Sequence, residues 1–145
     1  MIAFLVVGVS STTFAQKKEK NKGKEKEAKA IERPEKVGHA ATDDFVNSSF
    51  NLYEKNQKVA AQLSDAANSV SDAEGIKKDL DGQMEEVKGL LGKSKDVLTE
   101  AKGITPKTNS MKAVKAVNAA TKALNETQKN IPGQLEAIKN QGATE

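Results

Sequence analysis

Residues 101–107, AKGITPK, decide how this 145-residue chain folds. Gly103 suits the left-handed position that ends many helices, and Ile104 can fold back onto the helix it follows. Thr105 can cap a new helix that starts at Pro106, because the missing N–H of proline is not needed in a first turn. The stretch predicts that one helix stops here and another begins, so the flanking segments form the two arms of a helical hairpin.

The arm before this turn carries a seven-residue apolar repeat. A helix start is predicted at Asp43, and from Phe45 to Ala101 apolar side chains fall at alternating spacings of four and three. This spacing places one stripe along one face of a helix. Val46 and Tyr53 widen the stripe, and a wide stripe is typical of a helix bundle rather than a two-stranded coil.

The arm after the turn repeats the pattern in a new phase. Its two series are Val114, Thr121, Gln128 and Leu135, and Val117, Leu124, Ile131 and Ile138. Pro132 interrupts them, and a proline inside a helix removes one hydrogen bond at a cost of ~3 kcal/mol. Because the phase survives, we expect a kink or short break with the last turns still packed on the same face.

Residues 68–75, NSVSDAEG, leave two arrangements open within an all-α fold. Ser71 and Glu74 have the spacing of a capping box, and Gly75 lowers helix propensity, which favours a turn. The unbroken repeat from Phe45 favours one continuous helix, ~90 Å long at ~1.5 Å per residue. The turn predicts an elongated antiparallel three-helix bundle with heptad packing over 42–141, and the continuous helix predicts a long hairpin that oligomerises. The helices of the bundle are expected at about 43–70, 72–102 and 106–140, with the kink at 132.

The predicted seam is the line of residues along which the helices meet. Its larger members are Leu63, Val70, Leu80, Met84, Val87, Leu91, Leu98, Val117, Leu124 and Ile131. Ser49, Asn56 and Lys77 also fall on seam positions. A buried Asn can set helix register, whereas the alternative is a hydrated end of the bundle.

Small residues are frequent in the same segments. Ala113, Ala116 and Ala120 are expected in the interior, where each buries little area, so we expect a marginal domain. Gly75, Gly82 and Gly89 recur every seven residues opposite the seam. They either leave a smooth strip for another helix or are tolerated on an exposed face.

The first fifteen residues predict a cleaved export signal. An apolar run, residues 1–9, is followed by small residues, and Thr13 and Ala15 take the −3 and −1 positions of a cleavage site. The run is shorter than the ~20 residues of a membrane-spanning helix. We therefore expect an exported protein, periplasmic or extracellular, without a transmembrane span.

Residues 16–41 predict a disordered basic linker. The stretch 17–36 holds eight Lys and one Arg against five Glu, and its one large apolar residue, Ile31, cannot offset the entropy of ordering. The segment could contact anionic lipids or glycans weakly through its lysines. These are Lys17, Lys18, Lys20, Lys22, Lys24, Lys26 and Lys29. Nucleic acid is not expected as a partner, because the segment has no aromatic side chain for base stacking.

The sequence shows no catalytic, cofactor-binding or metal-binding pattern. It has no Cys, which excludes thiolate catalysis and Cys-ligated metals, and its single histidine, His39, has no second imidazole to share a metal. It also lacks a phosphate loop, a nucleophile elbow and an HExxH motif. We therefore expect a non-enzymatic protein without cofactors.

Three non-enzymatic roles remain after this exclusion. The first is a structural or protein-interaction role in the bacterial envelope, with another envelope protein or a second copy of the chain as partner. The alternatives are an amphipathic binder of lipid surfaces or anionic glycans, and a periplasmic holdase-like chaperone. Only 3% of the residues are aromatic, which argues against the lipid binder, because aromatic side chains anchor interfacial helices.

Overall fold

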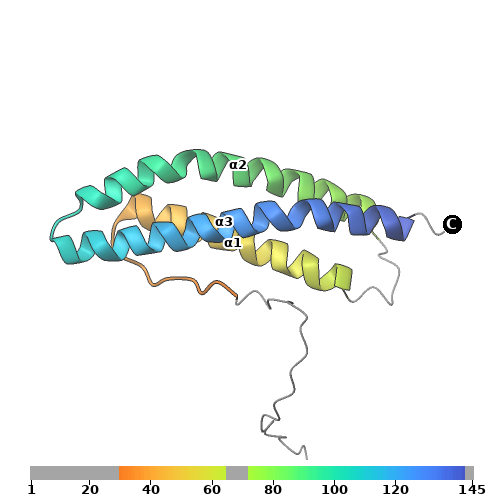
Figure 1. The fold of residues 1–145 in the computed structure, drawn as a ribbon, viewed down its shortest axis with the longest axis horizontal. Helices are drawn as coiled ribbons and strands as arrows, with labels where there is room; N and C mark the ends of the chain where they lie inside the picture. The colour runs from red at the N-terminus through yellow and green to blue at the C-terminus, as the bar shows by residue number, and fades with distance from the viewer. Residues whose placement is uncertain (1–29, 65–71, 143–145) are drawn as a thin grey trace, which may run out of the picture.

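The computed structural model describes residues 30–64 and 72–142, and its regular structure is helical throughout these ranges. The helices are α1 (Ala40–Ser64), α2 (Ala73–Gly103) and α3 (Lys107–Gly142). They lie side by side, each antiparallel to the next in sequence, and each contacts both others (Figure 1). The three-helix bundle is confirmed. The long hairpin is wrong, because α1 lies beside α2 instead of continuing into it.

Some predictions lie outside the described residues. These are the export signal at 1–15, the lysines from 17 to 29, the seam residue Val70 and the capping residue Ser71.

The first turn of α1 also binds the segment that precedes it. The N–H of Asp43 donates to the carbonyl of His39 (2.9 Å), so the helix begins at Ala40 rather than at Asp43. The Asp43 carboxylate accepts the N–H groups of Val37 (2.8 Å) and Gly38 (3.0 Å). Gly38 has φ +80°, which a glycine adopts without strain. This turn directs residues 30–37 back along the bundle (Figure 1).

The cap of α2 lies one residue after the predicted one. Asp72 is the N-cap, and its Oδ1 accepts the N–H of Gly75 (2.9 Å). A carboxylate suits this position because it satisfies a free N–H and faces the positive end of the helix dipole.

The turn that joins α2 to α3 differs from the expected cap. α2 continues through Gly103, and Ile104 is the C-cap, with φ −66°, ψ 137° and its N–H bonded to the Ala101 carbonyl (3.4 Å). The prediction of a left-handed Gly103 was wrong, because Gly103 is the last residue of α2 and Gly38 is the only described glycine with a positive φ. The chain leaves the helix through the extended backbone of Ile104 instead. Pro106 precedes α3 instead of starting it, and its carbonyl accepts the N–H groups of Asn109 and Ser110.

Helix α3 contains Pro132 within a single helix of 36 residues. Pro132 and Gly133 are exposed, whereas Gln134 and Ile138 beyond them are buried. The last turns of α3 therefore stay packed on the bundle.

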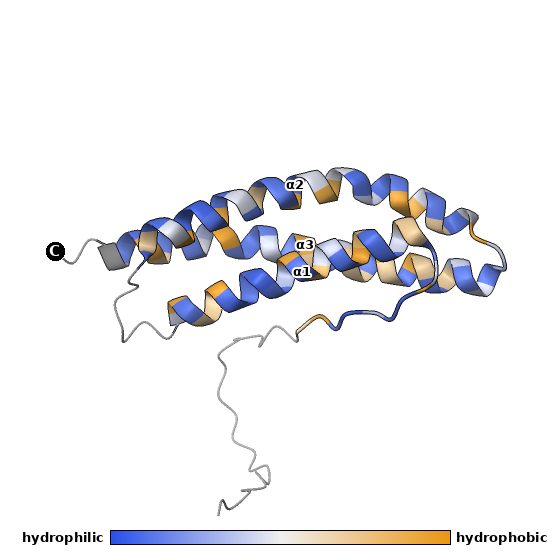
Figure 2. Cartoon of the chain, turned by 180° about the vertical axis from the view of Figure 1, so that it is seen from behind, coloured by the Kyte–Doolittle hydropathy of each residue, from blue (hydrophilic) through white to orange (hydrophobic). Residues whose placement is uncertain are grey.

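The core consists of two hydrophobic clusters, and hydrophobic and hydrophilic residues alternate along each helix (Figure 2). The larger cluster comprises Phe45, Val46, Phe50, Leu52, Tyr53, Val87, Ala101, Ala113, Ala116, Val117, Ala120, Ala123 and Leu124. The smaller cluster comprises Val59, Leu63, Leu80, Ile131 and Ile138.

The seam residues do not share one environment. The structure buries Leu63, Leu80, Val87, Val117, Leu124 and Ile131. Met84, Leu91 and Leu98 are half-buried. Lys77 is exposed, so its place on the seam was wrong. Ile76, beside it in sequence, packs against the smaller cluster and turns Lys77 toward water.

The seam of α3 was predicted half correctly. The series of Val117, Leu124, Ile131 and Ile138 is buried, but the series that begins at Val114 is only half-buried. Its place is taken by Ala113, Ala120, Thr127 and Gln134. α3 packs against α1 and α2 at once, so this series faces the narrow space between those two helices. That space accommodates small side chains and a hydrogen-bonded amide.

Candidate interaction surfaces

A layer of three amide side chains, one from each helix, is buried among the helices. Asn56 of α1, Gln83 of α2 and Gln134 of α3 are 0%, 1% and 8% exposed. Nδ2 of Asn56 donates to Oε1 of Gln83 (3.1 Å) and to Oε1 of Gln134 (2.7 Å). Nε2 of Gln134 donates back to the carbonyl and Oδ1 of Asn56, both at 3.3 Å. The hydrated-end alternative is therefore wrong for Asn56.

This amide layer connects to the surface on one side. Nε2 of Gln83 donates to Oδ2 of Asp79 (3.3 Å), and Asp79 also pairs with Lys55 of α1. The chain of contacts spans the α1–α2 interface from the interior to solvent. Amides carry no charge, so the layer can fix the register of the helices but offers no acid or base for catalysis.

The single imidazole lies at the start of α1. His39 is half-buried, and its Nδ1 lies 3.0 Å from Oγ1 of Thr42 and 3.4 Å from the Thr42 backbone nitrogen. These contacts hold the first turn of the helix. Within residues 30–64 and 72–142, no three His, Asp or Glu side chains gather closely enough to hold a metal ion.

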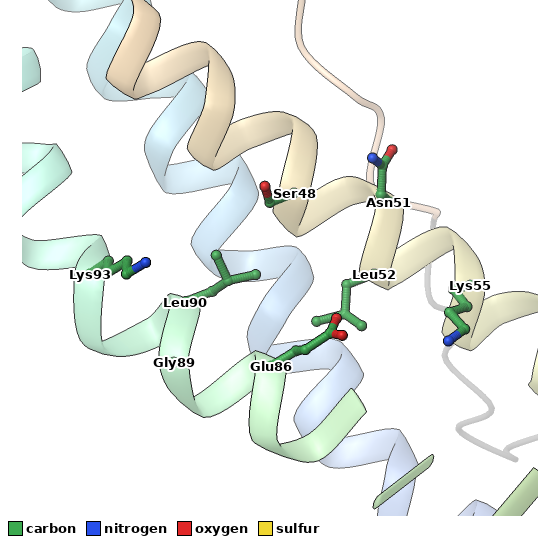
Figure 3. Close-up of a pocket in the computed structure, with 8 residues that line it drawn as sticks. All are labelled: Ser48, Asn51, Leu52, Lys55, Glu86, Gly89, Leu90 and Lys93. Atoms are coloured by element: carbon green, nitrogen blue, oxygen red, sulfur yellow. The ribbon is translucent and has the colours of Figure 1, made fainter. Parts of the chain in front are cut away.

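The first surface feature is a groove of 430 Å³ between α1 and α2, called the α1–α2 groove below. Leu52 and Leu90 point toward one another between the two helices and form its floor (Figure 3). Gly89 of α2 also lines the groove, and a Cβ added there would meet nothing within 4 Å. The rim is polar and consists of Ser48, Asn51, Lys55, Glu86 and Lys93.

The second surface feature depends on the segment before α1. The N–H of Ile31 donates to the Tyr53 hydroxyl (3.3 Å), and Ile31 packs against the larger cluster together with Val37. Arg33 donates to Oδ1 of Asn51 (2.6 Å), pairs with Glu54 (3.1 Å) and lies 5.8 Å from the ring centroid of Phe50. The end of the predicted linker is therefore attached to the bundle.

This attached segment forms one wall of a second groove, of 450 Å³, whose other wall is α3. We call it the α3 groove. Its lining residues are Pro34, Glu35, Lys36, Val37, Lys112, Lys115, Ala116 and Ala119. Three of the eight are lysines and one is a carboxylate, so the groove carries a positive charge.

Sequence reasoning missed both grooves and two of the three amides. In the sequence Gly89 is only part of a glycine repeat, and the repeat does not indicate that Leu52 and Leu90 line one groove. Gln83 and Gln134 do not stand out in the sequence, because polar residues do not contribute to an apolar stripe. Asn56 on the seam was the available signal, since a buried amide needs polar partners on the facing helices.

No helix in the described part of the chain is both long enough and apolar enough to cross a membrane. Comparison of the chain with protein-family models, with curated proteins and with solved structures gives no match. The role of the protein therefore rests on its surfaces.

Proposed function

We propose that this protein is a non-enzymatic, exported interaction module of the bacterial envelope, and that it binds another envelope protein through the α1–α2 groove. Export rests on the predicted signal at residues 1–15. The observation that carries the binding proposal is the apolar floor of Leu52 and Leu90 beneath a polar rim. Protein interfaces have this composition, with an apolar centre inside a polar border.

The charges on the rim support a specific partner. Glu86 and Lys93 form no ion pair with any other described residue, because the ion pairs there are Arg33–Glu54 and Lys55–Asp79. A partner that presents a lysine to Glu86 and a carboxylate to Lys93 would be selected by charge and oriented along the groove.

The interaction role has more support than the lipid-binding and chaperone alternatives. Among the described residues, Met111 is the only large hydrophobic side chain that is strongly exposed, at 54%. Unfolded clients and membrane surfaces are both bound through extended apolar area. One methionine supplies too little of it.

The test compares two glycines of α2. Gly89 lines the α1–α2 groove and Gly92 does not, yet a Cβ at either meets open space. Gly89→Trp should fill the groove, whereas Gly92→Trp places the same bulk elsewhere on the same helix. Each variant is expressed in the native host, crosslinked in the cell and purified, and circular dichroism checks that both are folded.

We expect a defined partner to be captured by the native chain and by Gly92→Trp, and to be lost with Gly89→Trp. If Gly89→Trp captures the same partner equally well, the groove is not the binding site. If no protein is captured by the native chain, the interaction role itself is wrong.

A further inference from the structure

Positive charge is concentrated on α3 and on the turn that precedes it. Between Glu100 and Glu126 the chain has no acidic residue and five lysines, all of them exposed: Lys102, Lys107, Lys112, Lys115 and Lys122. α3 holds six Lys against two Glu, whereas α2 holds six Lys against seven acidic residues. The net charge of the helices is therefore segregated onto α3.

The lysines of α3 form a line. Lys115, Lys122 and Lys129 recur every seven residues, so they share one face and lie ~10.5 Å apart at ~1.5 Å per residue. Asn118 and Asn125 lie between them and are also exposed. We call these five residues the lysine ridge. None of its lysines forms an ion pair with another described residue. Glu126, the carboxylate nearest in sequence, is half-buried, and the exposed Glu136, seven residues after Lys129, ends the line.

The α3 groove lies at one end of this ridge, and Lys115 belongs to both. Its lining includes the apolar side chains Val37, Ala116 and Ala119, and Lys36 and Lys112 line it together with Lys115. Glu35 is the one carboxylate among the lining residues. Apolar lining side chains suit the C–H face of a sugar ring, and lysine ammonium groups suit an acidic substituent on that ring.

We propose that an extended anionic polysaccharide binds along the lysine ridge, with one acidic sugar in the α3 groove. Regularly spaced ammonium groups match a polymer that repeats its charge, and the intervening Asn side chains can donate to and accept from sugar hydroxyls. The stretch 17–29, with seven Lys and three Glu, adds long-range attraction. This surface is separate from the α1–α2 groove, because α3 packs against both other helices and the ridge faces away from them.

The composition of the ridge favours a polysaccharide over two other polyanions. A membrane surface would gain little, since the ridge has no apolar side chain and Met111 is the one large exposed apolar residue near it. A nucleic acid would find neither an aromatic side chain to stack on nor an Arg.

The test uses the full chain and polygalacturonate, a linear polymer with one carboxylate per sugar. The ridge variant is Lys115→Gln/Lys122→Gln/Lys129→Gln. The matched control is Lys77→Gln/Lys78→Gln/Lys88→Gln, which removes the same charge from exposed lysines of α2. Both variants keep the lysine-rich stretch 17–29. Affinity is measured by titration calorimetry at low salt, and dextran serves as the neutral polymer.

We expect the ridge variant to bind polygalacturonate at least about tenfold more weakly than the native chain, and the control to change affinity by less than about threefold. Dextran should not bind. Circular dichroism should be unchanged in both variants, because all substituted residues are exposed.

Four results would overturn the proposal. An equal loss of polygalacturonate affinity in the ridge variant and in the control would show that binding depends only on net charge. Loss on replacing the seven lysines of 17–29 by Gln, with the ridge variant unaffected, would assign binding to that stretch. If the ridge variant loses more affinity for phosphatidylglycerol vesicles than for polygalacturonate, the ridge binds a membrane instead. Absence of polygalacturonate binding by the native chain would exclude the polysaccharide directly.

Discussion

Asn56 is the most connected side chain inside the bundle, since it contacts Gln83 and Gln134 at once. Asn56→Leu should destabilise the protein by about 3 kcal/mol, because Oε1 of each glutamine would lose a buried hydrogen bond and each orphaned group costs ~1–3 kcal/mol. Urea unfolding followed by circular dichroism measures the change. Gln57→Leu is the control on the same helix, and as an exposed substitution it should shift stability by no more than ~0.5 kcal/mol.

A companion variant separates hydrogen bonding from side-chain size. Asn56→Leu/Gln83→Leu/Gln134→Leu removes the whole amide layer, so no polar group is left without a partner. It should be more stable than Asn56→Leu alone, as replacement of complete buried polar networks is often neutral or stabilising. If it is less stable, the cost of Asn56→Leu comes from packing instead.

At the scale of a helix, the glycines of α2 fall into two kinds. Gly82→Ala should stabilise the protein by ~1 kcal/mol, because a Cβ there meets nothing within 4 Å and alanine has higher helix propensity. Gly75→Ala should give no gain. Its Cβ would collide with the Asp72 carboxylate, and loss of that N-cap costs ~1 kcal/mol, which cancels the propensity gain. Thermal unfolding of the two variants tests this difference, and an equal gain from both would contradict the role of the cap.

The helices could be predicted from the sequence because their repeats are long and their boundaries carry proline, glycine and acidic residues. The burial of Val117, Leu124 and Ile131 followed from the same repeat. The burial of the second series of α3, which contains Thr127 and Gln134, could not be predicted from the repeat, because these positions hold polar residues instead of Val or Leu. Their burial depends on partners from other helices, namely Asn56 for Gln134, and sequence periodicity within one helix contains no such information.

The grooves could not be predicted for a similar reason. The α1–α2 groove needs Leu52 and Leu90 to face one another across two helices, and the α3 groove needs residues 34–37 to turn back on the bundle. That turn depends on the Asp43 carboxylate accepting two backbone N–H groups. The sequence suggested a helix-start carboxylate, and the contact with the incoming segment appears only in three dimensions.

At the scale of the whole molecule, the two proposed surfaces lie on different sides. The α1–α2 groove is bounded by two helices, and the lysine ridge lies on the outer face of the third. A protein partner and a polysaccharide would therefore not compete for the same residues. The bundle could join the two, with α3 attached to the polymer and the opposite side open to the partner.

The two hydrophobic clusters also differ in size, with thirteen buried residues in the larger and five in the smaller. Opening the smaller one exposes less apolar area, so the half of the bundle around Ile131 and Ile138 should unravel as a separate cooperative unit before global unfolding. Native-state hydrogen exchange should show its amides opening at lower free energy and lower denaturant dependence than those around Val117. The molecule would then behave as a firm half joined to a fraying half, with the α1–α2 groove and Lys115 beside the larger cluster and Lys129 beside the smaller one.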